Sequence, residues 1–215
     1  MTRDSDPFTE YAAEYDRWFD SAEGRDIFSR EVECLRNVMP STKGRWVEIG
    51  VGTGRFAEAL GVQEGIDPSA VMLGLARGRG IETVEGTGEQ LPFADDCFDG
   101  VLLVVTLCFL DDPKTAFCEI HRILKDTGRL ILGMIPSESP WGELYARKAS
   151  QGHPIYAAAN FHSCDEVLDL ADTTGFTFIK ACSCLLTAPE ADIKADRSTP
   201  KIVKNAGFVA MAFTS

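Results

Sequence analysis

Apolar runs alternate with amphipathic stretches along most of the 215-residue chain. Short runs rich in Val, Ile and Leu predict strands, and apolar residues three or four positions apart predict helices. Strands are expected at 45–50, 64–67, 81–85, 98–106, 128–135, 176–184 and 207–213, and helices at 54–60, 69–77, 113–125 and 164–174. Ser163 and Glu166 form an S-x-x-E pair, which predicts the start of the last of these helices.

Strict alternation of strand and helix predicts a parallel sheet with helices on both faces. The runs at 101–105 and 130–135 are continuously apolar, as is typical of strands buried on both faces. The last two strands follow each other without a clear helix between them, which indicates an antiparallel hairpin at the sheet edge. The sequence therefore predicts an α/β fold, doubly wound and Rossmann-like, with a seven-stranded, mostly parallel sheet.

Two flanking segments differ from this alternation. Residues 8–39 are expected to be helical, because Tyr11, Tyr15 and Trp18 recur at helical spacing and Pro40 ends the pattern. The stretch 136–162 mixes polar and aromatic residues. Since it follows the fifth strand, it should lie over the carboxyl ends of the sheet, where open α/β sheets bind ligands.

Charge and cysteine content narrow the class of protein. Asp and Glu number 33 against 21 Lys and Arg, a net charge of −12, which disfavours nucleic-acid partners. The seven cysteines include no C-x-x-C pair, so reduced thiols in a cytoplasmic protein are expected. The polar amino-terminal sequence does not resemble a secretory signal, and the longest apolar run, 101–110, is too short for a bilayer. We expect no membrane partner.

The stretch VEIGVGTGRF at 47–56 carries the first candidate chemistry. Glycines let a backbone approach a ligand closely, and the following helix offers free N–H groups at its start. The dinucleotide pattern G-x-G-x-x-G fits Gly50 and Gly52 but meets Arg55 at its third glycine. An NAD-dependent oxidoreductase is therefore disfavoured, and a tight turn without a ligand remains an alternative.

Two carboxylates suit S-adenosylmethionine instead. Glu48, at the end of the first strand, can attract the amino group of that cofactor. Asp67, in GIDPS at the end of the second strand, can accept both hydroxyls of a ribose. Asp67 alone is equally well explained as a residue at a helix start. The GTGEQLPF stretch at 86–93 follows the third strand and could cover an adenine.

Together, VEIGVGTGRF, GIDPS, GTGEQLPFADDCFDGVLLVVTLCFLDDP and EIHRILKDTGRLILG resemble the class I S-adenosylmethionine-dependent methyltransferases, most closely the type 11 group with its ubiquinone/menaquinone-biosynthesis-like enzymes. YAAEYDRWF and FHSCDEVLDLADTTGF are similar to the group's first helix and C-terminal region. The resemblance implies strand order 3-2-1-4-5-7-6 with the last strand antiparallel. It also implies one methyltransferase domain over 1–215, divided into a helical cap (8–39), a cofactor-binding core (45–135), a substrate-side insert (136–162), and a C-terminal helix with the edge hairpin (163–215).

The resemblance also implies a cofactor site. Its residues would be Glu48, Gly50, Gly52, Gly54, Asp67, Pro68, Met72, Thr87, Gly88, Glu89, Thr106 and Tyr15. Relatives often carry an acid where this chain has Thr87, and a polar residue or histidine where it has Cys108. No general base is therefore evident, and no catalytic residue is assigned.

The methyl acceptor is expected to be a small molecule held by the insert. The candidate pocket residues are Cys108, Trp141, Tyr145, His153 and Tyr156, whereas His121 is expected on the surface of a helix. Two alternatives stay open: a non-catalytic, regulatory S-adenosylmethionine-binding protein, and a metalloid methyltransferase that uses cysteine thiols. The thiols for that second alternative would be Cys108, Cys164, Cys182 and Cys184, although their spacing matches no metal-binding motif.

Overall fold

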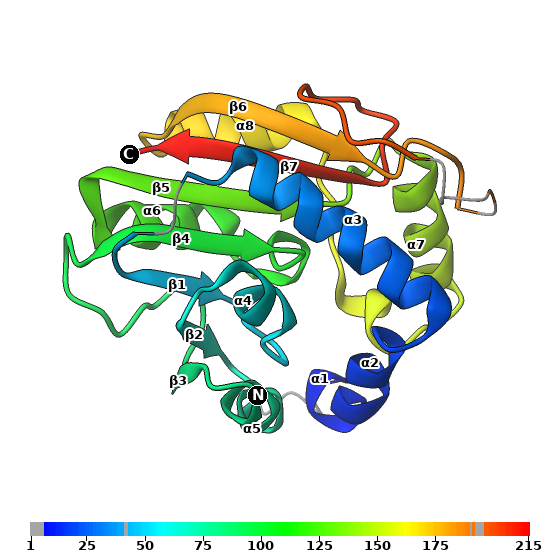
Figure 1. Cartoon of the computed structure of the whole chain (residues 1–215), viewed down its shortest axis with the longest axis horizontal. Helices are drawn as coiled ribbons and strands as arrows, with labels where there is room; N and C mark the ends of the chain where they lie inside the picture. The colour runs from blue at the N-terminus through cyan, green and yellow to red at the C-terminus, as the bar shows by residue number, and fades with distance from the viewer. Residues whose placement is uncertain (1–6, 41–42, 190, 192–195) are drawn as a thin grey trace.

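A computed structural model of the chain describes residues 7–40, 43–189, 191 and 196–215. Within these residues, one seven-stranded sheet has the order β3-β2-β1-β4-β5-β7-β6, as predicted (Figure 1). The strands are β1 (Trp46–Ile49), β2 (Glu64–Asp67), β3 (Glu82–Glu85), β4 (Phe98–Val104), β5 (Leu124–Met134), β6 (Thr177–Cys184) and β7 (Phe208–Thr214). Only β7, the last strand, runs antiparallel to its neighbours, which confirms the predicted edge hairpin.

Helices cover both faces of the sheet. One face carries α3 (Ala22–Val38), α4 (Arg55–Leu60) and α5 (Ala70–Gly78), and the other carries α6 (Pro113–Ile123) and α8 (Cys164–Thr173). In Figure 1, α3 crosses in front of β5 and β7, while α6 and α8 lie behind the sheet. The predicted cap of α8 is confirmed, since Ser163 Oγ accepts from the Glu166 N–H and the Glu166 carboxylate accepts from the Ser163 N–H.

The central strands explain the continuous apolar runs. Along β4, Leu102 packs with the core under α3, whereas Leu103 packs with the core under α6. Ile131 and Leu132 divide in the same way along β5. A strand covered on both sides needs apolar residues at every position. Within the described part of the chain, no helix combines the length and the apolar character needed to cross a bilayer.

The amino-terminal segment is helical, as predicted, but it is broken into three pieces: α1 (Pro7–Glu10), α2 (Ala12–Trp18) and α3. Ser21 caps α3 by accepting a hydrogen bond from the Gly24 N–H at 2.9 Å. A side chain at Gly24 would lie 2.1 Å from the Trp18 carbonyl oxygen, so the chain turns tightly there. These breaks fold the first helices away from α3 and over the sheet edge (Figure 1).

Three predicted boundaries were wrong. The helix expected at 113–125 ends at Ile123. The fourth strand ends at Val104 rather than at 106, because Val105 has a φ of 51° and turns the chain. The fifth strand begins at Leu124 rather than at 128, directly after α6. The insert 136–162 contains α7 (Pro140–Ser150) and the short 3-10 helix η2 (Tyr156–Ala158).

Candidate functional site

The glycine loop leaves β1 at the carboxyl edge of the sheet. All three glycines are left-handed, with φ of 70° at Gly50, 52° at Gly52 and 83° at Gly54. A Cβ on Gly50 would lie 2.3 Å from Thr106 Cγ2, and one on Gly54 would lie 3.0 Å from Ala76. At Gly52, by contrast, a Cβ would meet nothing within 4 Å. Gly50 and Gly54 therefore let the protein pack, and Gly52 leaves backbone open to a ligand.

Glu48 is a buried carboxyl group with an unpaired oxygen. Its side chain is 1% exposed, and Oε2 has no hydrogen-bond partner among the described residues. Burial raises the pKa of Glu48 well above its ordinary value; the Ala57 backbone lowers it in part, and the charge of Asp67 raises it further. An unsatisfied buried acceptor costs free energy, so this oxygen fits the amino group of a bound cofactor.

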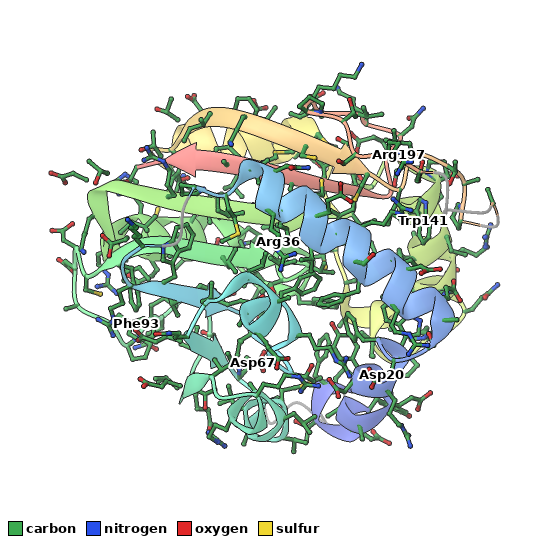
Figure 2. The ribbon with its side chains drawn as sticks, viewed as in Figure 1. Asp20, Arg36, Asp67, Phe93, Trp141 and Arg197 are labelled. Atoms are coloured by element: carbon green, nitrogen blue, oxygen red, sulfur yellow. The ribbon has the colours of Figure 1, made fainter. Side chains whose placement is uncertain are left out.

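Asp67 joins the glycine loop to the start of α5. Its Oδ2 accepts from the Gly52 N–H and its Oδ1 from the Ser69 N–H, both at 2.9 Å. A carboxylate oxygen has more than one acceptor position, so Asp67 can also accept from ribose hydroxyls. Figure 2 marks Asp67 at the end of β2, above α5.

Arg55, which breaks the dinucleotide pattern, binds the amino-terminal cap. Its Nε lies 2.9 Å from Asp16 Oδ1, and Arg79 Nη2 lies 2.9 Å from Asp16 Oδ2. Burial opposes ionisation of Asp16, but hydrogen bonds from Arg55, Thr53 and Arg79 outweigh it and hold the pKa of Asp16 at about 2. Asp20 adds a second, exposed partner to Arg55 at 2.9 Å. Arg55, which stands where the dinucleotide pattern has its third glycine, thus holds α2 beside the glycine loop.

The cap also crosses the neighbouring strands. Thr9 Oγ1 lies 2.9 Å from Ser69 Oγ, at the start of α5 beyond β2. The ring centroids of Phe8 and Phe109 lie 4.9 Å apart, edge to face, beyond the end of β4. Together with the Asp16 ion pairs, these contacts place the cap over the ends of β1, β2 and β4.

Tyr15 lies on α2, in the amino-terminal cap. Burial raises its pKa first, and the charges of Tyr156, Glu31, Glu48 and Asp67 raise it further. The Tyr15 ring packs edge to face on that of Phe19, with centroids 5.3 Å apart. Its location at the cofactor stays a prediction.

Some residues of the segment expected to cover the adenine make packing contacts and hydrogen bonds within the protein. Gly88 is buried, and a Cβ there would lie 3.0 Å from Leu110. Glu89 Oε1 accepts from the Asp111 N–H at 2.9 Å, which holds the loop before α6. Thr87 is exposed. On α5 and just before it, Met72 is 1% exposed and Pro68 is exposed.

The end of β4 carries the strained residue Val105. A β-branched residue with positive φ is uncommon and marks sites where the surroundings fix the backbone. Thr106 Oγ1 donates to the Val104 carbonyl at 3.0 Å. Burial raises the pKa of Cys108 to about 12, which leaves a neutral thiol at physiological pH.

Three predicted pocket residues lie together in the insert. The Tyr145 and Tyr156 ring centroids are 4.7 Å apart, and those of His153 and Tyr156 are 4.5 Å apart. Trp141 adjoins this group, with its ring centroid 6.5 Å from that of Tyr145. Its Nε1 donates to the Thr187 carbonyl at 2.9 Å and its ring lies against Gly207, so its indole also holds the C-terminal region. In Figure 2, Trp141 lies on α7, away from Asp67.

Glu31 is a buried acid on the amino-terminal segment that the sequence analysis did not identify. It lies on α3, is 7% exposed, and burial raises its pKa to about 8. The available signal was periodicity: Ile27, Glu31 and Leu35 follow at intervals of four, which puts an acid on the apolar face of the helix.

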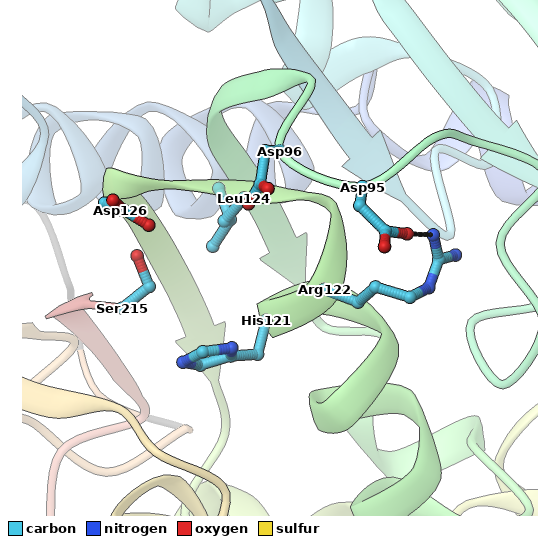
Figure 3. Close-up of a pocket in the computed structure, with 7 residues that line it drawn as sticks. All are labelled: Asp95, Asp96, His121, Arg122, Leu124, Asp126 and Ser215. Carbon is cyan, nitrogen blue, oxygen red and sulfur yellow. Dashed lines mark hydrogen bonds and ion pairs between the residues drawn. The ribbon is translucent and has the colours of Figure 1, made fainter.

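A cavity of about 490 Å³ lies elsewhere (Figure 3). It opens at the amino ends of β4 and β5, opposite the glycine loop, and is lined by Asp95, Asp96, His121, Arg122, Leu124, Asp126 and Ser215. His121, expected on the surface, is partly buried, because its ring packs 5.2 Å from that of Phe176. A hollow of about 10 Å³ beside Cys108 includes Phe161 and His162 in its lining.

The four cysteines proposed for a metalloid do not assemble. Cys182 and Cys184 lie in the core under α3, and Cys164 lies in the core on the other face of the sheet. Within the part of the chain that the structure describes, no group of three or more His, Cys, Asp or Glu residues is placed to hold a metal ion. The geometry therefore gives the metalloid alternative no support.

Comparisons with known proteins identify the family. A family model described as a methyltransferase domain matches residues 47–132. The crystal structure of a SAM-dependent methyltransferase from Thermotoga maritima, named a possible histamine N-methyltransferase, is 36% identical, with a TM-score of 0.89 and 97% coverage of both chains. An uncharacterised Methanocaldococcus jannaschii protein is 40% identical over 95% of this chain and 97% of its own. An uncharacterised Mycobacterium tuberculosis protein is 42% identical, over 94% of this chain and 71% of its own length.

The fold and the site thus define an S-adenosylmethionine-dependent methyltransferase of class I architecture. The chain belongs to this family, and S-adenosylmethionine is its cofactor.

Proposed function

We propose that the protein methylates a small molecule bound between the carboxyl edge of the sheet, the cap and the insert, with Glu48 and Asp67 holding the cofactor. The observation that carries this assignment is Oε2 of Glu48, which is buried and has no hydrogen-bond partner among the described residues, four positions before the open backbone of Gly52. A ligand with an amino group beside a flexible chain satisfies that oxygen, and Asp67 lies at the next strand for a ribose.

The cofactor supplies a methyl group already activated on a sulfonium, so the chain must chiefly position the acceptor and exclude water. The cap excludes water from the site, because Phe8, Thr9 and Asp16 make contacts over the ends of three strands. The neutral Cys108 thiol offers no base, which fits an acceptor atom that is nucleophilic without one.

Calorimetry with S-adenosylhomocysteine tests the cofactor assignment. We expect Asp67→Ala to weaken binding by about tenfold or more, as loss of hydrogen bonds to a charged group does. Glu82→Ala is the matched control, because Glu82 is exposed at the opposite end of β3 and should leave binding unchanged. Failure of the unsubstituted protein to bind would refute the proposal.

Transfer of labelled methyl groups to an acceptor panel tests the substrate class. The Thermotoga maritima relative is named a possible histamine N-methyltransferase, so histamine belongs in the panel beside phenols, thiols and carboxylic acids. Methylation of a protein or RNA substrate, and of no small molecule, would contradict a small-molecule acceptor.

A further inference from the structure

A small hollow of about 10 Å³ lies at the carboxyl ends of two central strands. Its lining comes from the end of β5, from Val105, Leu107 and Cys108 after β4, and from Phe161 and His162 at the end of the insert. Leu107 belongs to the core under α6, whereas Val105 and Phe161 pack against the core under α3. The hollow therefore lies at the edge of the sheet where its two faces meet.

The hollow adjoins the glycine loop. Thr106, which stands between two lining residues, has its Oγ1 3.3 Å from the Gly50 carbonyl oxygen. The strands that lead to these two residues, β1 and β4, are parallel neighbours in the sheet, so their carboxyl ends lie side by side. A molecule that enters the hollow is thus held next to the loop expected to hold the methionine part of the cofactor.

Backbone hydrogen bonds fix the end of the insert against this edge. The Asn160 N–H donates to the Cys108 carbonyl at 2.7 Å, and the Ser137 N–H donates to the His162 carbonyl at 2.9 Å. His162 is therefore held at both sides, by the turn after β4 and by the start of its own insert.

One ring nitrogen of His162 is buried without a partner. No described residue makes a hydrogen bond with its Nε2. The only other polar side chain in the lining is that of Cys108, whose thiol donates to the Val105 carbonyl, with sulfur and oxygen 3.6 Å apart. An unpaired buried polar atom costs about 1–3 kcal/mol. A ligand group that bonds to Nε2 is therefore favoured in an otherwise apolar hollow.

The size of the hollow limits what this group is. A volume of about 10 Å³ takes a group about as large as one water molecule. A hydroxyl or a primary amino group has that size and both donates and accepts hydrogen bonds, so it satisfies Nε2 in either tautomer of the ring. A methyl group fits as well but leaves the nitrogen unpaired, and a carboxylate or a phosphate group is larger.

The wall next to the hollow is aromatic. The Phe161 ring stacks on that of Tyr145 with centroids 6.1 Å apart, and the rings of Tyr145 and Tyr156 lie 4.7 Å apart. Aromatic side chains favour contact with apolar surfaces and with other rings. The part of a ligand that remains outside the hollow is therefore expected to be apolar or aromatic.

We propose that the methyl acceptor places a hydroxyl or amino group in this hollow, hydrogen-bonded to His162 Nε2, and packs an apolar or aromatic body against Phe161 and the tyrosines. This inference rests on the proposed methyltransferase function and narrows its substrate class. His162 determines specificity, because its nitrogen is satisfied by a polar group and left unpaired by an apolar one of equal size.

Three probes of nearly equal shape test the hollow: phenol, aniline and toluene, which differ only in the group on the ring. Calorimetry measures their binding to the full chain saturated with S-adenosylhomocysteine. We expect phenol or aniline to bind at least about tenfold more tightly than toluene, as a hydrogen bond to an unpaired buried atom predicts. In His162→Phe this preference should fall below about threefold, whereas His162→Gln, which keeps an amide near the position of Nε2, should retain part of it.

His121→Phe is the matched control. His121 lines the cavity at the amino ends of the strands, so the same change of side chain there should leave the preference unchanged.

Nitrogen-15 resonances of the histidine rings give a readout that a packing role would not produce. Phenol or aniline should shift the Nε2 resonance of His162, which is assigned by its absence in the His162 variants. Toluene fills the same space without a hydrogen bond and should leave that resonance nearly unchanged.

Several results would overturn the proposal. These are an absence of phenol and aniline binding to the loaded protein, an equal affinity for the three probes, and a preference that survives in His162→Phe. An Nε2 resonance that phenol and aniline leave unchanged would also overturn it, because the hollow would then hold water only. If His162→Phe does not fold, His162→Gln and the resonance of the unsubstituted protein decide between the outcomes.

Failure of the proposed function looks different. Binding of S-adenosylhomocysteine to each variant shows that the fold and the cofactor site are intact. An absence of that binding in the unsubstituted protein would refute the proposed function itself, whereas normal cofactor binding without a preference for phenol or aniline refutes only the role of His162.

Discussion

Glu31 makes the stability of the protein depend on pH in a direction opposite to that of most carboxylates. In the unfolded chain a glutamate titrates near its ordinary pKa of 4.5, and in the folded chain burial raises the pKa of Glu31 to about 8. Between these values the unfolded state releases a proton that the folded state keeps. The contribution of Glu31 to stability should therefore be most favourable below about pH 4.5. It should fall as the pH rises and become constant above about pH 8.

The size of the effect follows from the interval between the two pKa values. Each pH unit within it lowers the free energy of unfolding by about 1.4 kcal/mol, so the full interval amounts to something on the order of 5 kcal/mol. That is a large part of the total stability of a typical domain. Glu48 is shifted in the same direction and adds to the trend.

Glu31→Gln isolates the contribution of one residue. Glutamine has nearly the same shape but does not titrate. Glu48, Tyr15 and Tyr145 remain in both proteins, so their titration largely cancels in the difference. The stability of the variant relative to the unsubstituted protein should rise by about 1.4 kcal/mol per pH unit between about pH 5 and pH 8. The Glu33→Gln control should show no such rise, because Glu33 is exposed.

Urea unfolding of the cofactor-free protein at a series of pH values provides the measurement. Two-state transitions and equal m-values for the two proteins are needed for the comparison. Parallel stability curves for Glu31→Gln and the unsubstituted protein would refute the reasoning. They would mean that the Glu31 carboxylate is solvated or paired in the folded protein in solution.

Three further changes test other parts of the structure. Gly50→Ala should cost about 1–3 kcal/mol, because its Cβ would lie 2.3 Å from Thr106 Cγ2, just beyond β4. Gly61→Ala, with a similar positive φ but open space, should cost less, and equal losses in thermal unfolding would contradict the packing argument. Asp16→Asn should weaken S-adenosylhomocysteine binding by about tenfold through loss of the cap, and Asp20→Asn, which removes an exposed partner, should do so far less; the reverse order would argue against Asp16 as the anchor. Trp141→Phe should lower stability by roughly 1 kcal/mol through loss of its hydrogen bond to the Thr187 carbonyl. The KM for the acceptor should stay unchanged, and a raised KM would indicate that Trp141 contacts the acceptor.

Most of the fold could be predicted because its signals are local. Continuous apolar runs mark strands buried on both faces, and the Ser163 and Glu166 pair marks a helix start regardless of what surrounds it. Boundaries failed where the cause was not local. Val105 takes a positive φ at the end of β4 against the preference of its own side chain, so the sequence gives no sign that the strand stops there.

The site was predictable only in part for a similar reason. Glu48 and Asp67 lie at the carboxyl ends of strands that the pattern identifies, so their positions at one edge of the sheet follow from parallel pairing. Asp16 lies in a helix far away in sequence, and only the path of the folded cap brings it to that edge. The sequence places Trp141 in a segment that follows the fifth strand, near the carboxyl edge of the sheet. Whether its ring faces a pocket or the core depends on side-chain packing, which the sequence pattern does not show.

The ion pairs between Arg55 and Asp16 also have a consequence for sequence variation. The two positions are 39 residues apart and both side chains are largely buried, so loss of one charge leaves the other with a single remaining partner, Arg79 for Asp16 or Asp20 for Arg55. Relatives should therefore change the two positions together: a chain with a small or apolar residue at the position of Arg55 should also lack the acid on its second helix. Correlated substitution at this pair would reveal from sequences alone which family members close the cofactor edge with an ionic cap.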